Sequence, residues 1–268
     1  MDDKFISAKL DIVFKMLFAN EKNRDILKEF LSDMLDIPLD KLHNIRVKNP
    51  EINPEFADEK YYRLDLNIDI GNQLVNIELQ VRRESYYSDR TLLYWSKLYS
   101  SQLEEGSSYN DLCPCIVINI VDYIAFKKHD DFHSKFEAWD IEHYEKLSDK
   151  MEIHFFELKK IKKNQDISDR KKLWLRFIKA DTREEFAMLE NIGVPAIEKG
   201  VQALYDINSD EKAKEYIRMR EKALLDEISE LEAAKNEGRA EGIKSMIAGM
   251  RAAGFTEEQI EAARNAAQ

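Results

Sequence analysis

Residues 61–83 read YYRLDLNIDIGNQLVNIELQVRR, and this stretch decides the fold that the sequence predicts. Apolar and polar residues alternate along two runs that meet at Gly71-Asn72. Alternation with a period of two is typical of a half-buried β-strand, and Gly-Asn suits a two-residue turn that needs positive φ. The stretch therefore predicts a β-hairpin with its turn at Gly71-Asn72.

The turn also predicts which residues face each other across the hairpin. With Gly71 and Asn72 as the loop, Ile70 faces Gln73, and the register of all outer pairs follows. The expected pairs on one face are Ile68 with Val75, Leu66 with Ile77, and Leu64 with Leu79. This face is continuous and apolar, so we expect it in the core.

The other face of the hairpin is polar. Its first run carries Arg63, Asp65, Asn67 and Asp69, and its second carries Leu74, Asn76, Glu78 and Gln80. Asp65 is expected opposite Glu78, at a Cβ separation of roughly 4.5–5.5 Å, where like charges destabilise a sheet. Either a divalent cation such as Mg²⁺ lies at this carboxylate pair, as in metal-assisted phosphoryl chemistry, or the face is solvated and Arg63 and Arg82 relieve the acids.

Two helices are predicted before the hairpin. The first has apolar residues at helical spacing, and Ser7 is its expected N-cap; the apolar positions are Leu10, Val13, Phe14, Leu17 and Phe18. Asp11 and Lys15 lie four apart on another side of this helix, a spacing typical of a surface ion pair. Residues 23–35 form the second helix, which stops before Pro38. A short strand is expected at 45–48.

A helix and three strands are predicted after the hairpin. The helix, residues 88–104, places Arg90, Tyr94, Lys97 and Ser101 on one face, which is either a solvated stripe or a phosphate-contacting surface. Cys115–Val121 reads CIVINIV and indicates a strand buried on both faces. Residues 132–141 and 151–158 are the other expected strands. His129 and His133 superficially resemble a metal-ligand pair, but no third ligand is evident.

The C-terminal third is predicted to be helical. A long acidic helix at 211–237 carries an apolar stripe at heptad-like spacing, sustained for fewer than three heptads: Ile217, Leu224, Ile228 and Leu231. The helix either packs on its own domain or forms a short coil between two chains, which would make the protein a homodimer. Residues 256–259, TEEQ, form a capping box that opens a last helix. The expected domains are 1–165, 166–208 and 209–268.

Composition places the chain among globular proteins. It has 268 residues, of which 44% are hydrophobic and 35% charged. No apolar run approaches the roughly 18 residues of a membrane helix, and the N-terminus lacks a signal-peptide pattern, so we expect no membrane partner and a cytoplasmic location. The net charge of −11 argues against nucleic-acid binding, although Arg82, Arg83, Arg90 and Lys97 form a local basic rim.

Five features in this order resemble a known family. They are the run LDIVFKMLF at 10–18, RLD at 63–65, NIELQ at 76–80, Arg90, and GSSY at 106–109. Together they are similar to the Rpn family of recombination-promoting nucleases and putative transposases, in the PD-(D/E)XK nuclease superfamily. The resemblance covers roughly residues 5–160.

The resemblance implies a fold and a set of site residues. The fold is α/β, a restriction-endonuclease-like αβββαβ core with a mixed sheet, followed by a helical C-terminal region. Asp65 and Glu78 match the two acids of the motif, and Gln80 stands where most of the superfamily has Lys, which leaves open which group stabilises the attacking water. The resemblance also makes Asp11 a candidate to assist the site and Arg90 a candidate to contact phosphate.

Two functions follow as hypotheses. In the first, the chain is a DNA endonuclease dependent on Mg²⁺, with Mn²⁺ as a second candidate. Asp65, Glu78 and the backbone carbonyl of Leu79 would hold the metal, and Gln80 would orient the water. In the second, the same fold is a catalytically inactive DNA-binding or protein-interaction module.

Overall fold

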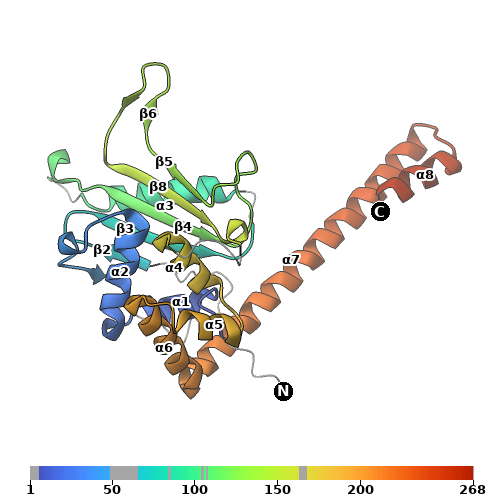
Figure 1. Ribbon diagram of the computed structural model, residues 1–268. Helices are drawn as coiled ribbons and strands as arrows, with labels where there is room; N and C mark the ends of the chain where they lie inside the picture. The colour runs from blue at the N-terminus through green and yellow to red at the C-terminus, as the bar shows by residue number, and fades with distance from the viewer. Residues whose placement is uncertain are drawn as a thin grey trace. The chain divides into compact units, whose positions relative to one another are not determined.

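The structure, a computed structural model, describes residues 6–48, 66–83, 86–103, 106, 108–162 and 168–267 (Figure 1). Of these, the residues up to Ile217 belong to one compact unit and those from Arg218 onward to a second. The first unit is an α/β fold built on one mixed sheet, in agreement with the predicted fold class.

The main sheet has six strands in the order β1-β2-β3-β4-β8-β5. Their bounds are β1 Arg46–Val47, β2 Leu66–Asp69, β3 Leu74–Gln80, β4 Cys115–Val121, β8 Met151–Glu157 and β5 His133–Phe136. Strands β3, β4 and β8 are mutually parallel, and the remaining pairs are antiparallel. The carboxyl ends of three central strands therefore meet at one edge of the sheet.

Strands β2 and β3 form the predicted hairpin. Leu66 pairs with Ile77 and Ile68 with Val75, as the sequence predicts. Gly71 has φ of +94°, and its N–H donates to Asp69 Oδ1 at 2.8 Å, so the turn needs a residue that tolerates positive φ. The apolar face is buried, which confirms its predicted place in the core. The expected partners Leu64 and Asp65 lie outside the described residues.

Strand β4 is the centre of the sheet, and every residue of CIVINIV is buried, as predicted. Helix α3, Tyr87–Ser100, connects β3 to β4 and lies on one face of the sheet (Figure 1). A core forms on this face from five buried side chains: Tyr87, Val117, Val121, Ile153 and Phe155.

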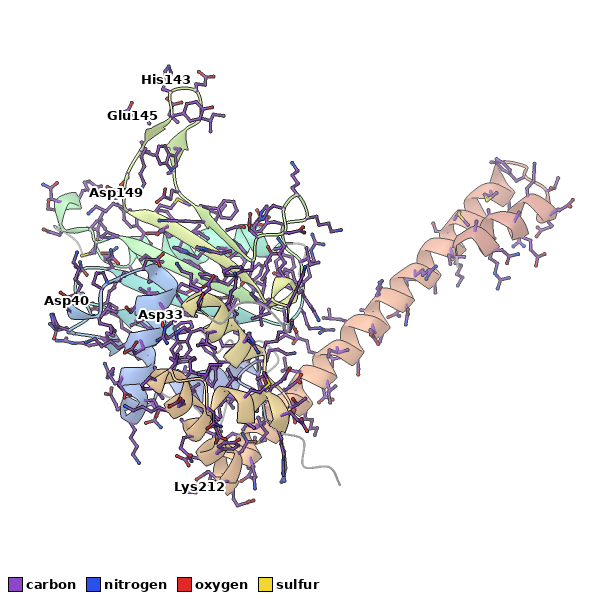
Figure 2. All side chains as sticks on the ribbon, viewed as in Figure 1. Asp33, Asp40, His143, Glu145, Asp149 and Lys212 are labelled. Carbon is purple, nitrogen blue, oxygen red and sulfur yellow. The ribbon has the colours of Figure 1, made fainter. Side chains whose placement is uncertain are left out.

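Helices cover the opposite face (Figure 1). They are α1 Asp11–Phe18, α2 Arg24–Leu35 and α4 Arg170–Lys179, followed by α5 Arg183–Leu189 and α6 Pro195–Ser209. Their aromatic rings pack together: the centre of the Phe30 ring lies 4.9 Å from that of Phe18 and 5.4 Å from that of Trp174. Asp33 on α2 (Figure 2) accepts hydrogen bonds from Trp174 Nε1 at 2.7 Å and Arg170 Nε at 3.1 Å, which joins α2 to α4.

Two predictions for the first helix are wrong. Ser7 is not its N-cap, because the helix begins at Asp11 and the Ser7 hydroxyl donates to the carbonyl of Ala180 at 2.6 Å instead. Lys15 is not on the surface: its exposed fraction is 2%. Both errors arise because helix α1 packs against segments that come much later in the chain.

The predicted strand at 132–141 is also wrong in its extent. Only β5 joins the main sheet, and β6, Trp139–Asp140, turns away to pair with β7, Glu145–Lys146. These two strands form a ribbon with His143 and Glu145 at its far end (Figure 2). The predicted helix at 88–104 ends earlier than expected, at Ser100.

The C-terminal helices are α7, Glu211–Ala252, and α8, Glu257–Ala267. Helix α7 is longer than the predicted 211–237. The capping box of α8 is confirmed, because Gln259 N–H donates to Thr256 Oγ1 at 3.3 Å and Thr256 N–H donates to Gln259 Oε1 at 3.0 Å. None of the described helices combines the length and apolarity that a membrane crossing requires.

Candidate active site

Strand β3 carries the candidate acid. Side chains alternate along a strand, so Asn76, Glu78 and Gln80 share the face that α3 covers, while Val75 and Ile77 point to the other core. Glu78 is only 6% exposed, so its side chain does not belong to a solvated polar face. A buried carboxylate needs hydrogen bonds or an opposite charge to stay ionised.

Arg90 supplies that charge from α3. It is 7% exposed, and its Nη2 lies 3.5 Å from Glu78 Oε2. The same nitrogen donates to Gln80 Oε1 at 2.8 Å, while Gln80 Nε2 donates to the carbonyl of Arg82 at 3.0 Å. The structure therefore brings Glu78, Gln80 and Arg90 together. The Gln80 amide is held at both ends, and each end has capacity for one further hydrogen bond.

A buried polar network lies beside these residues. The Tyr87 hydroxyl donates to Asn119 Oδ1 at 3.0 Å, and the Thr91 hydroxyl lies 3.2 Å from the same oxygen. Burial raises the pKa of Tyr87 well above its ordinary value, and the nearby Glu78 carboxylate adds to this effect. The guanidinium of Arg90 lies 4.6 Å from the centre of the Tyr87 ring. Tyr87 thus stays protonated and packs under the arginine that holds the acid.

The carboxyl ends of β3 and β4 carry a second acid. Asp122 directly follows β4, and its N–H donates to the carbonyl of Gln80 at 2.9 Å. Its carboxylate lies 3.3 Å from Lys9 Nζ and 3.8 Å from Lys159 Nζ. Ligands in open α/β sheets commonly bind beyond the carboxyl ends of the strands. In the sequence, the usable signal for this residue is an acid placed directly after the buried run at 115–121.

The remaining predicted residues are placed less completely. Asp11 begins α1, two residues after Lys9, and its Oδ1 accepts the N–H of Ile12 at 2.7 Å. The start of α1 is therefore at the edge that carries Asp122. Leu79 lies between Glu78 and Gln80 in β3, and the role of its carbonyl stays a prediction. Asp65 lies outside the described residues, so its place opposite Glu78 also stays a prediction.

The histidines form a different arrangement from a metal-ligand pair. His133 Nε2 lies 2.9 Å from Nδ1 of His154 on the neighbouring strand, and His154 Nε2 lies 3.0 Å from Glu152 Oε1. His129 instead lies beside Ser134, with its Nε2 3.4 Å from the Ser134 hydroxyl. Within the part of the chain that the structure describes, no three His, Cys, Asp or Glu side chains are grouped to hold a metal ion.

The fold and the site together define a class: an α/β protein with a restriction-endonuclease-like core, whose central hairpin carries an acid and an amide beside an arginine. The chain belongs to the PD-(D/E)XK nuclease family transposases, whose family model matches residues 8–234. The suspected family is thereby confirmed, and the match extends past the expected 5–160 through α4, α5 and α6. Comparisons with curated proteins and with solved structures gave no significant match.

Proposed function

We propose that the chain is a metal-dependent DNA endonuclease, which hydrolyses phosphodiester bonds with Mg²⁺ or Mn²⁺. The observation that carries this proposal is the buried Glu78, set beside Gln80 and Arg90 on the central strand of a nuclease-family fold. A buried acid beside a specific charge partner is a candidate functional group.

The donor set suits a hard divalent cation. The carboxylate of Glu78, the backbone carbonyl of Leu79 and the carboxylate of Asp65 would hold it, and all three offer the oxygen ligands that Mg²⁺ prefers. A bound divalent cation lowers the pKa of a bound water and neutralises charge that develops on the phosphate.

The protein side chains would then position the reactants. Arg90 lies against the carboxylate of Glu78 and holds the Gln80 amide, and its guanidinium would also contact a phosphate oxygen of the substrate. Gln80 would orient the attacking water with the hydrogen-bonding capacity that Arg90 and Arg82 leave to it. Asp11 would assist from the start of α1.

The test is cleavage of DNA by purified protein with Mg²⁺ or Mn²⁺. We expect Asp65→Asn and Glu78→Gln each to reduce cleavage more than about a hundredfold, because replacing a ligand should exceed the 10–100-fold cost typical of outer partners. Glu145→Gln, the same type of change in the β6–β7 ribbon, should leave cleavage unchanged. Full activity in either site variant would refute the proposal.

A second candidate function is a catalytically inactive DNA-binding or protein-interaction module. Two observations favour it: the net charge of −11, and the ion pair that already neutralises Glu78 through Arg90. Calorimetric titration with Mg²⁺, comparing the wild type with Glu78→Ala, separates the two. Binding that Glu78→Ala removes supports the nuclease, and absence of binding in the wild type supports the module.

We also propose that different parts of the chain carry catalysis and self-association. Residues 1–165 would hold the chemistry, and residues from about 211 onward would promote a homodimer. Cutting both strands of a duplex with one site per chain is naturally served by two protomers, and two-fold dimers are the commonest homo-oligomers.

A further inference from the structure

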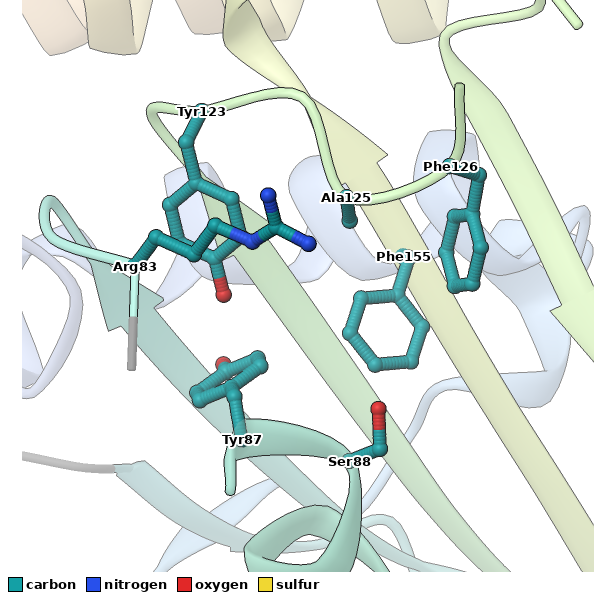
Figure 3. Close-up of a pocket in the computed structure, with 7 residues that line it drawn as sticks. All are labelled: Arg83, Tyr87, Ser88, Tyr123, Ala125, Phe126 and Phe155. Carbon is teal, nitrogen blue, oxygen red and sulfur yellow. The ribbon is translucent and has the colours of Figure 1, made fainter. Parts of the chain in front are cut away.

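A pocket of about 450 Å³ opens on the α3 face of the sheet, between the start of α3 and the segment after β4 (Figure 3). Its lining is mainly aromatic, from Tyr87, Tyr123, Phe126 and Phe155. Arg83 and Ser88 add two further polar side chains. The rings meet edge to face, with Phe155 centroids 5.9 Å from Tyr87 and 5.2 Å from Phe126. The volume is within the range of small-molecule sites, and the lining combines aromatic rings with polar groups.

The wall of the pocket is held in place by a buried acid. Glu157 has an exposed fraction of 0%, and its Oε1 accepts the N–H groups of Ala125 at 2.6 Å and Phe126 at 3.2 Å. Its Oε2 lies 2.7 Å from Lys160 Nζ, which also donates to the carbonyl of Phe126 at 2.8 Å. The segment that carries Phe126 is therefore fixed from both sides, and this wall of the pocket is preformed.

The pocket shares a residue with the candidate active site. Tyr87 lines the pocket, and its ring also lies under the guanidinium of Arg90, which contacts Glu78 and Gln80. The contacts therefore run from the pocket through Tyr87 and Arg90 to Glu78. An occupant of the pocket would lie on the same face of the sheet as Glu78.

The chemistry of the pocket specifies its occupant. Aromatic rings offer stacking surfaces, and the Arg83 guanidinium, which reaches across the opening in Figure 3, offers only hydrogen-bond donors and positive charge. Exposed Lys127 and Lys128 directly follow Phe126 and extend the positive charge along the chain. An occupant that matches these groups has a flat ring for stacking, hydrogen-bond acceptors for Arg83, and a negative charge such as a phosphate for the basic side chains. A nucleotide has this composition, and stacking on aromatic side chains is how proteins hold single bases.

We propose that this pocket binds one unpaired nucleobase of the DNA substrate, next to the phosphate that the Glu78 site attacks. The base must be unpaired, because a base inside a duplex has both faces covered by its neighbours. The inference rests on the proposed function and adds a substrate class to it: DNA with a bulge, a mismatch or a single-stranded end. Such DNA supplies the base with a smaller cost of unstacking than paired DNA does.

The test measures binding without cleavage. The full chain in EDTA is titrated with two fluorescently labelled duplexes that differ only in one extra, unpaired 2-aminopurine. We expect the bulged duplex to bind at least about fivefold more tightly, which is the lower end of what stacking of one base on an aromatic side chain provides. We also expect 2-aminopurine fluorescence to fall as the base stacks. Phe126→Ala and Arg83→Gln should each remove most of this preference.

Matched controls keep the result specific. Arg82→Gln removes the neighbouring exposed charge and should weaken binding of both duplexes equally, and Tyr109→Ala removes an exposed aromatic ring elsewhere and should change nothing. Equal wild-type binding of the two duplexes, or a preference that survives both pocket variants, would overturn the inference. If the protein cleaves paired DNA without that preference, only the pocket assignment fails. If it prefers the bulge but never cleaves, only the hydrolase assignment fails.

Discussion

Arg90 is a cation that the structure places against the buried carboxylate of Glu78. Both side chains are 7% exposed, so removing the arginine would leave a carboxylate in the protein interior without this partner. Breaking a buried pair by removing one partner typically costs 3–5 kcal/mol. The arginine is therefore expected to be important for stability as well as for the reaction.

We expect Arg90→Met to lower the free energy of unfolding by about 3 kcal/mol. Adding Glu78→Gln to this variant should recover much of the loss, because the double variant has no buried charge at this pair. Urea denaturation measures both. Arg82→Met, an exposed neighbour, is the control and should have little effect. Wild-type stability in Arg90→Met would show that the pair does not hold Glu78.

His133 predicts a pH dependence of stability. Burial lowers the pKa of His133 from its ordinary 6.5 to about 4, and His154 and Lys171 repel its charged form. The unfolded chain takes up this proton below about pH 6.5, whereas the folded chain does so only near pH 4. Folding stability from this residue is therefore complete above pH 6.5 and is lost as the pH falls toward 4.

His133→Gln should flatten the decline in stability between pH 6.5 and 4, since glutamine keeps a donor toward His154 but does not titrate. The measurement is the denaturation midpoint at several pH values, and the slope is the readout because the variant also loses the ring that stacks on Phe156 at 4.3 Å. The comparison is between the wild type and His133→Gln at the same pH values. Identical slopes in the two proteins would contradict the assignment.

At the residue scale, the sequence predicts where a side chain lies when its surroundings are set by residues close to it in the chain. Glu78 and Gln80 follow from strand alternation, and the site-facing position of Arg90 follows from helical spacing and the family resemblance. Lys15 and Asn119 could not be assigned in this way. Their burial depends on which helix covers which face of the sheet, and a single sequence does not specify that arrangement.

Helices α6 and α7 differ in how closely other atoms approach them, and one glycine in each shows the difference. A Cβ on Gly200 of α6 would lie 3.0 Å from Cζ of Phe177, a fully buried ring on α4. A Cβ on Gly242 of α7 would have no atom within 4 Å. Alanine favours a helix by about 1 kcal/mol over glycine at either position.

We expect opposite signs for the same substitution. Gly200→Ala should lower the melting temperature, because forcing an extra methyl against Phe177 typically costs about 1–3 kcal/mol and exceeds the gain in helix propensity. Gly242→Ala should strengthen α7 by up to about 1 kcal/mol. Thermal denaturation followed by circular dichroism compares the two. A stabilised Gly200→Ala would mean that α6 and α4 can move apart at little cost.

At the element scale, predictions succeed where the pattern is long and periodic. The hairpin register and the buried strand β4 are both visible in the alternation or continuity of apolar residues. Boundaries fail where a distant contact decides them. Ser7 bonds to Ala180 rather than capping α1, and the segment after β5 leaves the sheet to pair with β7, so neither boundary could be predicted from neighbouring residues.

Across the whole molecule, the described residues divide into a unit that carries the candidate site and a second unit that begins at Arg218 within α7. The predicted apolar stripe of α7 crosses this boundary. Ile217 is buried in the first unit, Leu224 and Ile228 are half-buried, and Leu231 is 57% exposed. The exposed part of the stripe is the part that a second chain can cover.

We therefore expect the homodimer, if α7 forms it, to depend on Ile228 and Leu231. Ile228→Asp combined with Leu231→Asp should convert a dimer to a monomer, since charges at the apolar positions of a coil oppose association. Leu225→Asp is the matched control, because Leu225 is 62% exposed but lies about one quarter turn away from the stripe. Light scattering of the full-length proteins gives the masses.

These substitutions leave the buried Ile217 in place. A chain that ends near Asn208 would lack Ile217, so its loss of dimer could result from unfolding of the first unit. A monomeric wild type, or a dimer that survives the double substitution, would show that α7 is not the dimerisation element and that any double-strand cleavage needs another arrangement of two sites.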